Sequence, residues 1–182
     1  MTKKIFVSLL VIVACIQLKA QLFEKNDINI NAGMGIGFNL YSISVLDIGI
    51  PPVTLSGDYG IVDDLGPGVI GVGPVIGFST FKSDYPLLDG GYKYTSVMFG
   101  ARGTYHVSFV DNIDTYGGWA LYFSTLKTKA YGTFSSTDAP IDAKLGIGLF
   151  VGAKYYFTEN LAAFAEAGYN ITWLTLGVTF KP

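Results

Sequence analysis

The stretch D27-I-N-I-N-A-G-M-G-I-G-F-N-L40 alternates strictly between two kinds of side chain. Every even position from Ile28 to Leu40 is apolar, and after Asp27 every odd position is Asn or Gly. A period of two is typical of a β-strand with one apolar face. The other face carries almost no charge, so it is a poor match for the exposed side of a soluble sheet. The rest of the sequence decides which face points inward.

The composition combines a high apolar content with few charges. Of the 182 residues, 50% are hydrophobic and 14% are charged, and 23 are glycine. A soluble domain carries roughly a quarter charged residues. Beyond residue 20, however, no stretch approaches the roughly 18 consecutive apolar residues that a membrane-spanning helix requires. High hydropathy without such a stretch indicates alternating strands.

The first 20 residues have the layout of a secretory signal peptide. Two early lysines precede an apolar run over 5–16, and Ala20 stands just before Gln21. The run is too short to span a bilayer as a helix. We therefore expect export, cleavage after Ala20 and a single barrel domain over 21–182.

Cys15 is the only cysteine and lies within this leader. Residues 12–15 (IVAC) also fit the processing pattern of lipoproteins, so lipidation of Cys15 stays open as an alternative to its loss. Cleavage after Ala20 lowers the basic count from 12 to 9 against 14 acidic residues, a formal charge of −5. The mature chain then forms no disulfide framework, and it has no basic stripe that would bind nucleic acid.

Acidic residues recur with a period of 48. Asp63, Asp111 and Glu159 are spaced by 48, and each is followed by Asp or Asn and then by an aliphatic residue. Short Asx side chains bond to nearby backbone and tolerate left-handed conformations, which is turn chemistry. Three such turns, separated each time by two strands and a longer loop, predict an internal repeat and eight strands.

We expect an all-β, eight-stranded antiparallel up-and-down transmembrane β-barrel. Its connections would alternate between tight turns at one surface and longer loops at the other, as in a meander that crosses a membrane. The predicted strands are 27–41, 52–62, 66–81, 93–109, 114–128, 144–158, 161–169 and 172–180. The predicted turns are 63–65, 110–113 and 159–160, with a tight link near Asn170, and the predicted loops are 42–51, 82–92 and 129–143.

Splitting each predicted strand by parity separates an apolar row from a polar one. The apolar rows, such as those over 97–109 and 145–157, are unbroken by charge and end in aromatics. The opposite rows are mostly small or polar and include Trp173 in the last strand. The interior of an eight-stranded barrel has room only for packed side chains, whereas a basic residue at mid-depth outside costs about 2–4 kcal/mol. We therefore predict that the apolar rows meet lipid and that the barrel is closed.

Pro74 lies inside the third predicted strand. Because proline removes a ladder donor, it fits a closed barrel poorly. We expect a bulge or a local break near Gly73 and Pro74, not a different fold.

The last third of the chain, G146-IGLFVGAKYYFTENLAAFAEAGYNITWLTLGVT-F180, resembles the small outer-membrane β-barrel proteins of the OmpA/OmpX-like superfamily. The tight turn Tyr-Phe-Thr-Glu-Asn over 156–160 is among its most specific pieces. The resemblance implies an eight-stranded barrel with its termini in the periplasm and its loops outside the cell. It also implies that the barrel assembly machinery reads the last strand at its terminal aromatic residue, Phe180, although Lys181 and Pro182 follow here.

Five polar side chains are expected to meet inside the barrel. Asp58, His106 and Lys154 each stand five positions before a turn acid, so they should lie inward near the periplasmic mouth. Arg102 and Glu166 are inward by parity as well. Buried charges persist only when they are paired. We therefore interpret the five as a structural network that closes the lumen, with ion conduction as the alternative.

His106-Val-Ser108 resembles the His-x-Ser of outer-membrane lipid A deacylases, which implies a hydrolase as a remote alternative. Such an enzyme needs a nucleophile within reach of its base and a third group that orients the base. His106 lies near the tight-turn end, away from the leaflet that carries lipid A, and no Glu is close in sequence. We expect no catalytic site, no cofactor and, from the spacing of His, Cys and carboxylates, no metal site.

The three predicted loops are the remaining candidates for function. They contain aromatics, Gly, Pro and Asp without strong charge. Function in such scaffolds tends to lie in loops. We expect a non-enzymatic outer-membrane protein that acts in envelope integrity or in contact with an extracellular ligand through 42–51, 82–92 and 129–143. The alternative is a small channel or a subunit of an envelope or secretion assembly.

Overall fold

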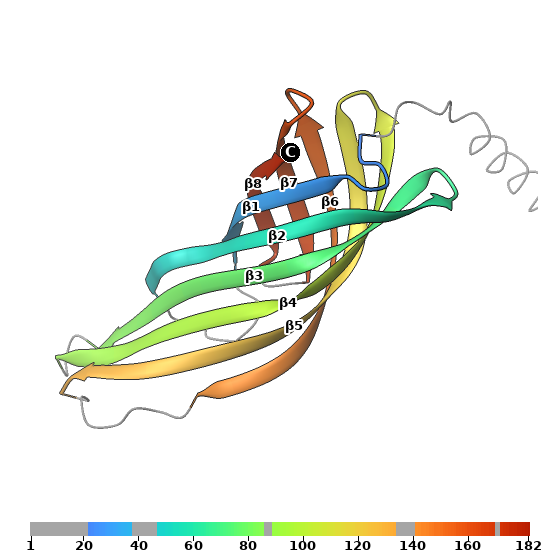
Figure 1. Cartoon of the computed structure of the whole chain (residues 1–182). Helices are drawn as coiled ribbons and strands as arrows, with labels where there is room; N and C mark the ends of the chain where they lie inside the picture. The colour runs from blue at the N-terminus through green and yellow to red at the C-terminus, as the bar shows by residue number, and fades with distance from the viewer. Residues whose placement is uncertain (1–21, 38–46, 86–88, 134–140, 170–171) are drawn as a thin grey trace, which may run out of the picture.

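Eight antiparallel strands close into one barrel (Figure 1). The computed structural model describes residues 22–37, 47–85, 89–133, 141–169 and 172–182. The strands are β1 (Ile28–Ile36), β2 (Asp47–Leu65), β3 (Gly68–Tyr85), β4 (Gly90–Val110), β5 (Ile113–Gly132), β6 (Asp142–Tyr156), β7 (Leu161–Tyr169) and β8 (Leu174–Phe180). Each strand pairs with the next, and β8 pairs back with β1. The predicted all-β, eight-stranded up-and-down barrel is confirmed. The expected leader over 1–20, Cys15 within it, and the link at Asn170 lie outside the described residues.

Four strands are longer than the sequence suggested. β2, β3, β4 and β5 contain 19, 18, 21 and 20 residues, whereas β7 and β8 contain 9 and 7. The predicted loops 82–92 and 129–143 are therefore wrong at both edges, and loop 42–51 is wrong at its C-terminal edge, because strand residues occupy these positions. Residues 42–46 lie outside the described part of the chain. Polar residues in these extensions continue the hydrogen-bonded ladders, so the strands extend beyond the residues that alternate between apolar and polar. In Figure 1 the long strands extend well past β7 and β8, away from the C-terminus.

Two of the three predicted tight turns are in place, and one is displaced. Asp111 and Asn112 form the β4–β5 turn, where Asn112 has the left-handed φ of 62° that Asx residues tolerate, and residues 157–160 connect β6 to β7. The turn predicted at 63–65 is wrong. β2 continues through Asp63 with irregular pairing, and the chain reverses at residues 66–67 instead. Gly66, with a φ of 73°, supplies the left-handed conformation that a side chain disfavours.

The ladder around Pro74 is interrupted on one side. Pairing of β2 with β3 passes from Ser56↔Val75 to Tyr59↔Val72 and skips the same number of residues on both strands. No register shift accompanies the gap, and Pro74 remains in register with Ala101 of β4. The expected disturbance is therefore a local break without a bulge. The facing residue of β2 is Gly57, and a Cβ there would lie only 3.3 Å from the Pro74 Cδ. The lack of a side chain at Gly57 leaves room for the proline ring.

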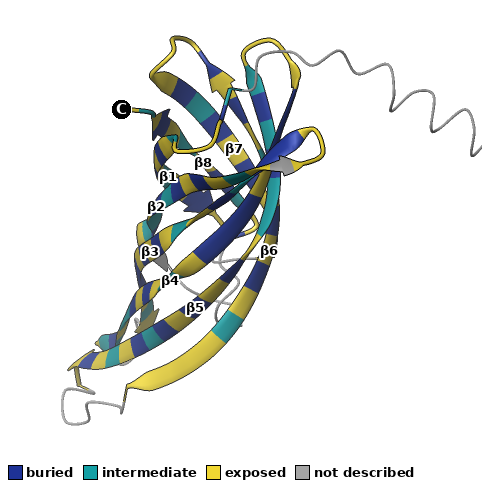
Figure 2. Cartoon of the chain, turned by 45° about the vertical axis from the view of Figure 1, so that its right-hand side comes forward, coloured by how far each residue is buried: buried dark blue, intermediate teal, exposed yellow. Residues whose placement is uncertain are grey.

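Side chains alternate between buried and exposed along the strands, as Figure 2 shows. The exposed rows are the apolar ones, for example Leu145, Ile147, Leu149 and Val151 of β6, each 65–72% exposed. The assignment of apolar rows to the outside is therefore confirmed. Trp173 is an exception to the predicted rows. It lies in the bend before β8, outside the strand alternation, and is exposed, with its ring 5.9 Å from that of Tyr169.

Glycines of the inner rows face large aromatic side chains. A Cβ at Gly146 would lie 2.5 Å from the Tyr122 ring, and one at Gly152 would lie 2.4 Å from the ring of Tyr116. Contacts this short are not tolerated, so these positions must lack a side chain. The inner row is rich in glycine because a narrow barrel cannot hold a side chain at every inward position.

Candidate functional site

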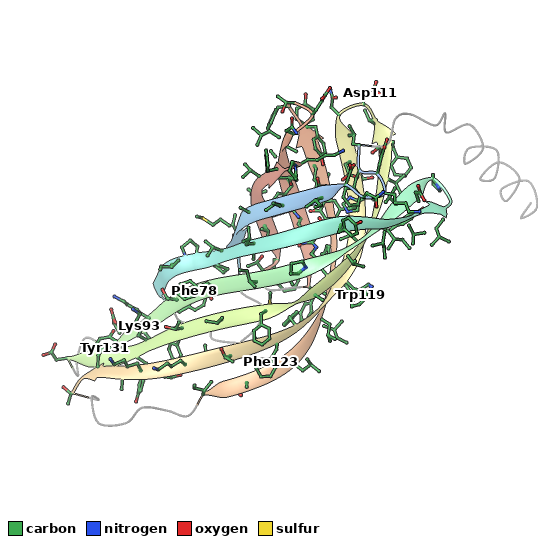
Figure 3. The ribbon with its side chains drawn as sticks, viewed as in Figure 1. Phe78, Lys93, Asp111, Trp119, Phe123 and Tyr131 are labelled. Carbon is green, nitrogen blue, oxygen red and sulfur yellow. The ribbon has the colours of Figure 1, made fainter. Side chains whose placement is uncertain are left out.

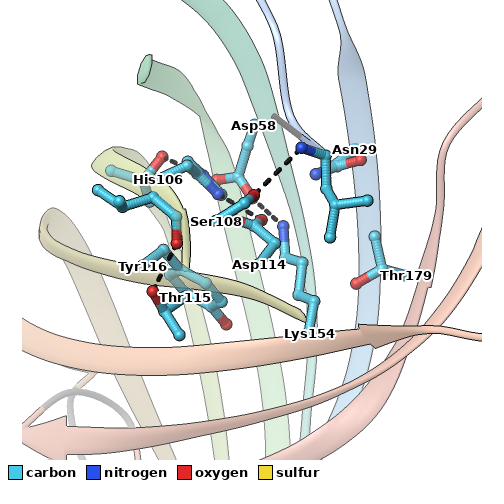
Figure 4. Close-up of polar contacts among 12 residues, drawn as sticks. Asn29, Asp58, His106, Ser108, Asp114, Thr115, Tyr116, Lys154 and Thr179 are labelled. Carbon is cyan, nitrogen blue, oxygen red and sulfur yellow. Dashed lines mark hydrogen bonds and ion pairs between the residues drawn. The ribbon is translucent and has the colours of Figure 1, made fainter. Parts of the chain in front are cut away.

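An ion-pair network crosses the barrel interior, with Asp58 of β2 at its centre (Figure 4). Lys154 Nζ, from β6 on the opposite wall, lies 3.1 Å from Asp58 Oδ2. Arg102 Nε, from β4, lies 3.1 Å from the other carboxylate oxygen. Asn31 Nδ2 also donates to Asp58 Oδ2, at 2.9 Å. Strands far apart in the sequence are thus joined through one buried carboxylate.

Arg102 links this centre to a second carboxylate. Its Nη2 lies 2.9 Å from Glu166 Oε2 of β7, and its Nη1 donates to Ser56 Oγ at 3.1 Å. The guanidinium also lies 4.3 Å from the centroid of the Phe150 ring, a cation–π geometry. The planar guanidinium thus bridges two carboxylates while its face packs on an aromatic ring.

His106 belongs to a separate part of the network, nearer the short turns. Its Nδ1 lies 2.7 Å from Asp114 Oδ2, and its Nε2 lies 3.0 Å from Thr104 Oγ1. The Tyr116 ring stacks on the imidazole with the ring centroids 5.2 Å apart. All four side chains are buried.

Phe23 closes the short-turn end of the lumen. It precedes β1, is fully buried, and packs on His106 with ring centroids 4.2 Å apart. The segment is held in place on both sides, because the Leu22 amide donates to Ser108 Oγ and Lys181 Nζ donates to the Leu22 carbonyl. An aromatic plug therefore lies over the ion pairs.

Little space is left around the network. The cavity lined by Ser56, Arg102, Phe164, Glu166 and Thr175 holds only about 10 Å³, room for about one water molecule. The five residues predicted for the lumen all lie inside and are buried. Four of them, Asp58, Arg102, Lys154 and Glu166, are joined by ion pairs, while His106 pairs with Asp114 instead.

Sequence reasoning missed several members of this site, among them Phe23, Asp114 and Tyr116. Asp114 and Tyr116 were within reach of the parity rule, since both share a row of β5 with the buried Ala120 and Tyr122. Phe23 carried no signal, because it precedes the first alternating segment.

Thr104, His106 and Asp114 place hydroxyl, imidazole and carboxylate in the order of a catalytic triad. All three side chains are buried, and Phe23 packs on the imidazole of His106. Ser108, the nucleophile of the hydrolase alternative, accepts a hydrogen bond from the backbone of Leu22. Within the described ranges, no three His, Cys or carboxylate groups are arranged to hold a metal ion, and no helix has the length and apolarity to cross a membrane.

Comparisons with known proteins concern the barrel as a whole. A scan against protein-family models and a search of curated proteins find no match to this sequence. The outer membrane protein OprG from Pseudomonas aeruginosa matches with a TM-score of 0.58 and 12% identity, covering 87% of this chain and 97% of that chain. This chain has the fold of the small outer-membrane β-barrels. At such identity the likeness concerns the fold alone.

Two further barrels are similar at lower TM-scores. Ail, the attachment invasion locus protein of Yersinia pestis, matches with a TM-score of 0.48 and 13% identity, covering 85% of this chain and 93% of that chain. The N-terminal β-barrel domain of Pseudomonas aeruginosa OprF matches with a TM-score of 0.45 and 18% identity, covering 88% of this chain and 100% of that chain.

Proposed function

We propose that the mature chain, residues 21–182, is an integral outer-membrane protein without catalytic activity that acts in envelope integrity or surface contact. The observation that carries the membrane placement is the inversion of polarity across the wall. Apolar rows are exposed on the outside of the strands, whereas ion pairs and the only histidine are buried inside. In water this arrangement exposes a large apolar surface, but in a bilayer it satisfies both sides of the wall.

The contact surface is the end away from the short turns. A strand needs about 9–11 residues to cross a bilayer, so strands of 18 to 21 residues continue well beyond it. There β6 begins at Asp142 but pairs with β7 only from Leu149, which leaves one edge of the extended sheet unpaired in the described part of the chain. An extended peptide can add to such an edge. This edge and the connections over 82–92 and 129–143 are the proposed contact site.

A closed lumen favours this function over a channel. Within the described part of the barrel, buried ion pairs and Phe23 fill the lumen, and the cavity beside Arg102 and Glu166 holds about one water molecule, which supports a lumen closed to ions at rest. A hydrolase is disfavoured by the same burial of His106. A role as a subunit of an envelope or secretion assembly uses the same contact surface.

The C-terminal strand is the proposed contact with the barrel assembly machinery. β8 ends at Phe180, whose side chain is exposed on the outside. Lys181 follows the last strand residue, and its Nζ lies 2.5 Å from Asp27 Oδ2 at the barrel mouth. The aromatic terminus therefore stays accessible despite the two extra residues.

Two measurements test the proposal. The membrane placement requires that the purified mature chain, after removal of detergent, folds only when lipid vesicles are present. A monomer folded in plain buffer would contradict it. The contact role requires that replacing residues 134–140 with a Gly-Ser linker lowers adhesion or loses copurifying proteins while the barrel still folds. Unchanged adhesion, permeability and copurification would contradict that role.

A further inference from the structure

A row of lysines crosses β3, β4 and β5 on the outer face of the extended sheet. Lys82 lies opposite Lys93 in the β3–β4 ladder, and Lys93 lies opposite Lys129 in the β4–β5 ladder. All three are exposed, and among the described residues no carboxylate forms an ion pair with them. Like charges directly opposite one another destabilise a sheet. An anion between them would remove that repulsion.

The lysine row lies just beyond the apolar band. Lys82 follows Phe78 by four positions and Lys93 precedes Val97 by four, so each shares an outward row with an exposed apolar residue (Figure 3). At roughly 3.3 Å per residue and a tilt of roughly 40°, four positions correspond to about 10 Å along the barrel axis. Lysine stems are long and flexible. The ammonium groups therefore reach the head-group layer of the leaflet on the long-loop side.

A groove of about 670 Å³ surrounds these lysines. It is lined by Lys82, Asp84, Asp89, Gly90, Lys93, Lys129 and Tyr131. Of its two carboxylates, Asp84 accepts a hydrogen bond from the Tyr131 hydroxyl, which lies over Gly91. Asp84 and Tyr131 both lie farther from the apolar band than the lysines, so the ammonium groups form the side of the groove that faces the membrane.

A second hollow, of about 440 Å³, opens on the lipid-facing wall below the lysines. Its outward lining is apolar and includes Ala32, Leu55, Ile76, Phe78, Val97 and Phe99. The small side chain of Ala32 leaves this space between larger neighbours. Phe78 and Val97, which border the hollow, share their outward rows with Lys82 and Lys93. The hollow and the lysine row thus form one continuous surface along the outer wall, which we call the track.

We propose that this track binds one anionic lipid of the adjacent leaflet, with its phosphate on Lys82 and Lys93 and an acyl chain in the hollow. The inference rests on the proposed membrane placement. The phosphate neutralises the facing ammonium groups, and Lys129 extends the site to a second phosphate or a larger sugar-phosphate head group. An apolar hollow next to a row of ammonium groups fits an amphiphile better than a free anion, which would leave the hollow unused.

The test measures retention of bis-phosphorylated lipid A by the full mature chain in nonionic detergent, by native mass spectrometry over a titration. The variant Lys82→Gln/Lys93→Gln is compared with Lys25→Gln/Lys144→Gln, which removes the same charge from two lysines that pair with Asp63 and Asp142. We expect affinity to fall about 30-fold in the first variant, from about 1 kcal/mol per lysine, and to stay unchanged in the second. Equal affinity in all three proteins would overturn the proposal.

A second pair of measurements separates a lipid from a free anion. Ala32→Leu fills the hollow from the lipid side, where added apolar volume leaves the fold intact, and should weaken retention of lipid A several-fold. Inorganic phosphate should not displace the lipid. Displacement by millimolar phosphate, or unaltered retention in Ala32→Leu, would overturn the two-part site. A chain that inserts into vesicles but fails to retain phosphorylated lipid contradicts this inference alone, whereas one that folds without lipid contradicts the membrane placement.

Discussion

At the scale of single residues, the interior depends on a few carboxylates that each serve several partners. Asp58 is contacted by Lys154, Arg102 and Asn31, and Glu166 by Arg102 and Tyr116. A buried ion pair contributes little when compared with apolar packing, but removal of one partner leaves a charge without compensation. The network therefore specifies which strands face one another across the lumen more than it adds stability.

Substitution of one cation tests this dependence. Lys154→Met should lower the free energy of unfolding by about 3 kcal/mol, the lower end of the range for a broken buried pair, because Arg102 still neutralises Asp58. Lys144→Met, which breaks the exposed pair with Asp142, should cost less than about 1 kcal/mol. Urea unfolding in lipid vesicles, followed by tryptophan fluorescence, measures both. Equal losses of unfolding free energy in the two variants would contradict a larger contribution from the buried pair.

At the scale of elements, strands β2 to β5 are longer than a bilayer crossing, so one part of each should lie in lipid and another should extend past it. Exposure to solvent does not distinguish the two parts, since Val151 and Ile141 are 65% and 62% exposed. Val151 lies within the β6–β7 ladder, opposite Ala167, whereas Ile141 lies just before β6, at the far end of the extended sheet. We expect only Val151 to lie at membrane depth.

Arginine at these two positions distinguishes lipid from water around β6. Val151→Arg should destabilise the barrel by about 2–4 kcal/mol, the cost of a basic side chain near the bilayer midplane. Ile141→Arg should change stability by no more than about 0.5 kcal/mol, as for an ordinary surface substitution. Unfolding in vesicles supplies both values. A similar small effect at both positions would show that water surrounds Val151.

The elements also show how far sequence alone leads. The alternation of residues correctly predicted which side chains of most strands point into the barrel, including those of Arg102 and Glu166. Once one side chain of a strand is known to point inward, the period of two fixes the direction of all the others. The strand ends were not predicted as well. Tyr92, Lys93 and Tyr94 do not alternate between apolar and polar side chains, yet the β3–β4 ladder continues through them. Phe23 was missed because it closes the lumen from an irregular segment. The turn predicted at Asp63 forms instead at Gly66 and Pro67, residues that also favour a chain reversal.

At the scale of the whole molecule, the two ends of the barrel differ. The short-turn end carries the C-terminus, Phe23 and the ion pair between Asp27 and Lys181. The opposite end carries the extended sheet, the lysine row and the groove beside it. Figure 1 shows the strands that extend at this end. The proposed contact surface and the lysine row therefore lie at one end, and the buried ion pairs lie between the two ends.

Conductance in planar bilayers tests the blocked lumen. The protein should show no stable, large open state, and Phe23→Ala should show none either. Phe23 covers His106, whereas Arg102 lies deeper in the barrel, farther from the β4–β5 turn. The ion pairs of Arg102 with Asp58 and Glu166 should therefore still close the lumen when the Phe23 ring is removed. Long-lived conductance steps from the unmodified protein would mean that the ion pairs open at rest. The network would then line a channel rather than fill the barrel.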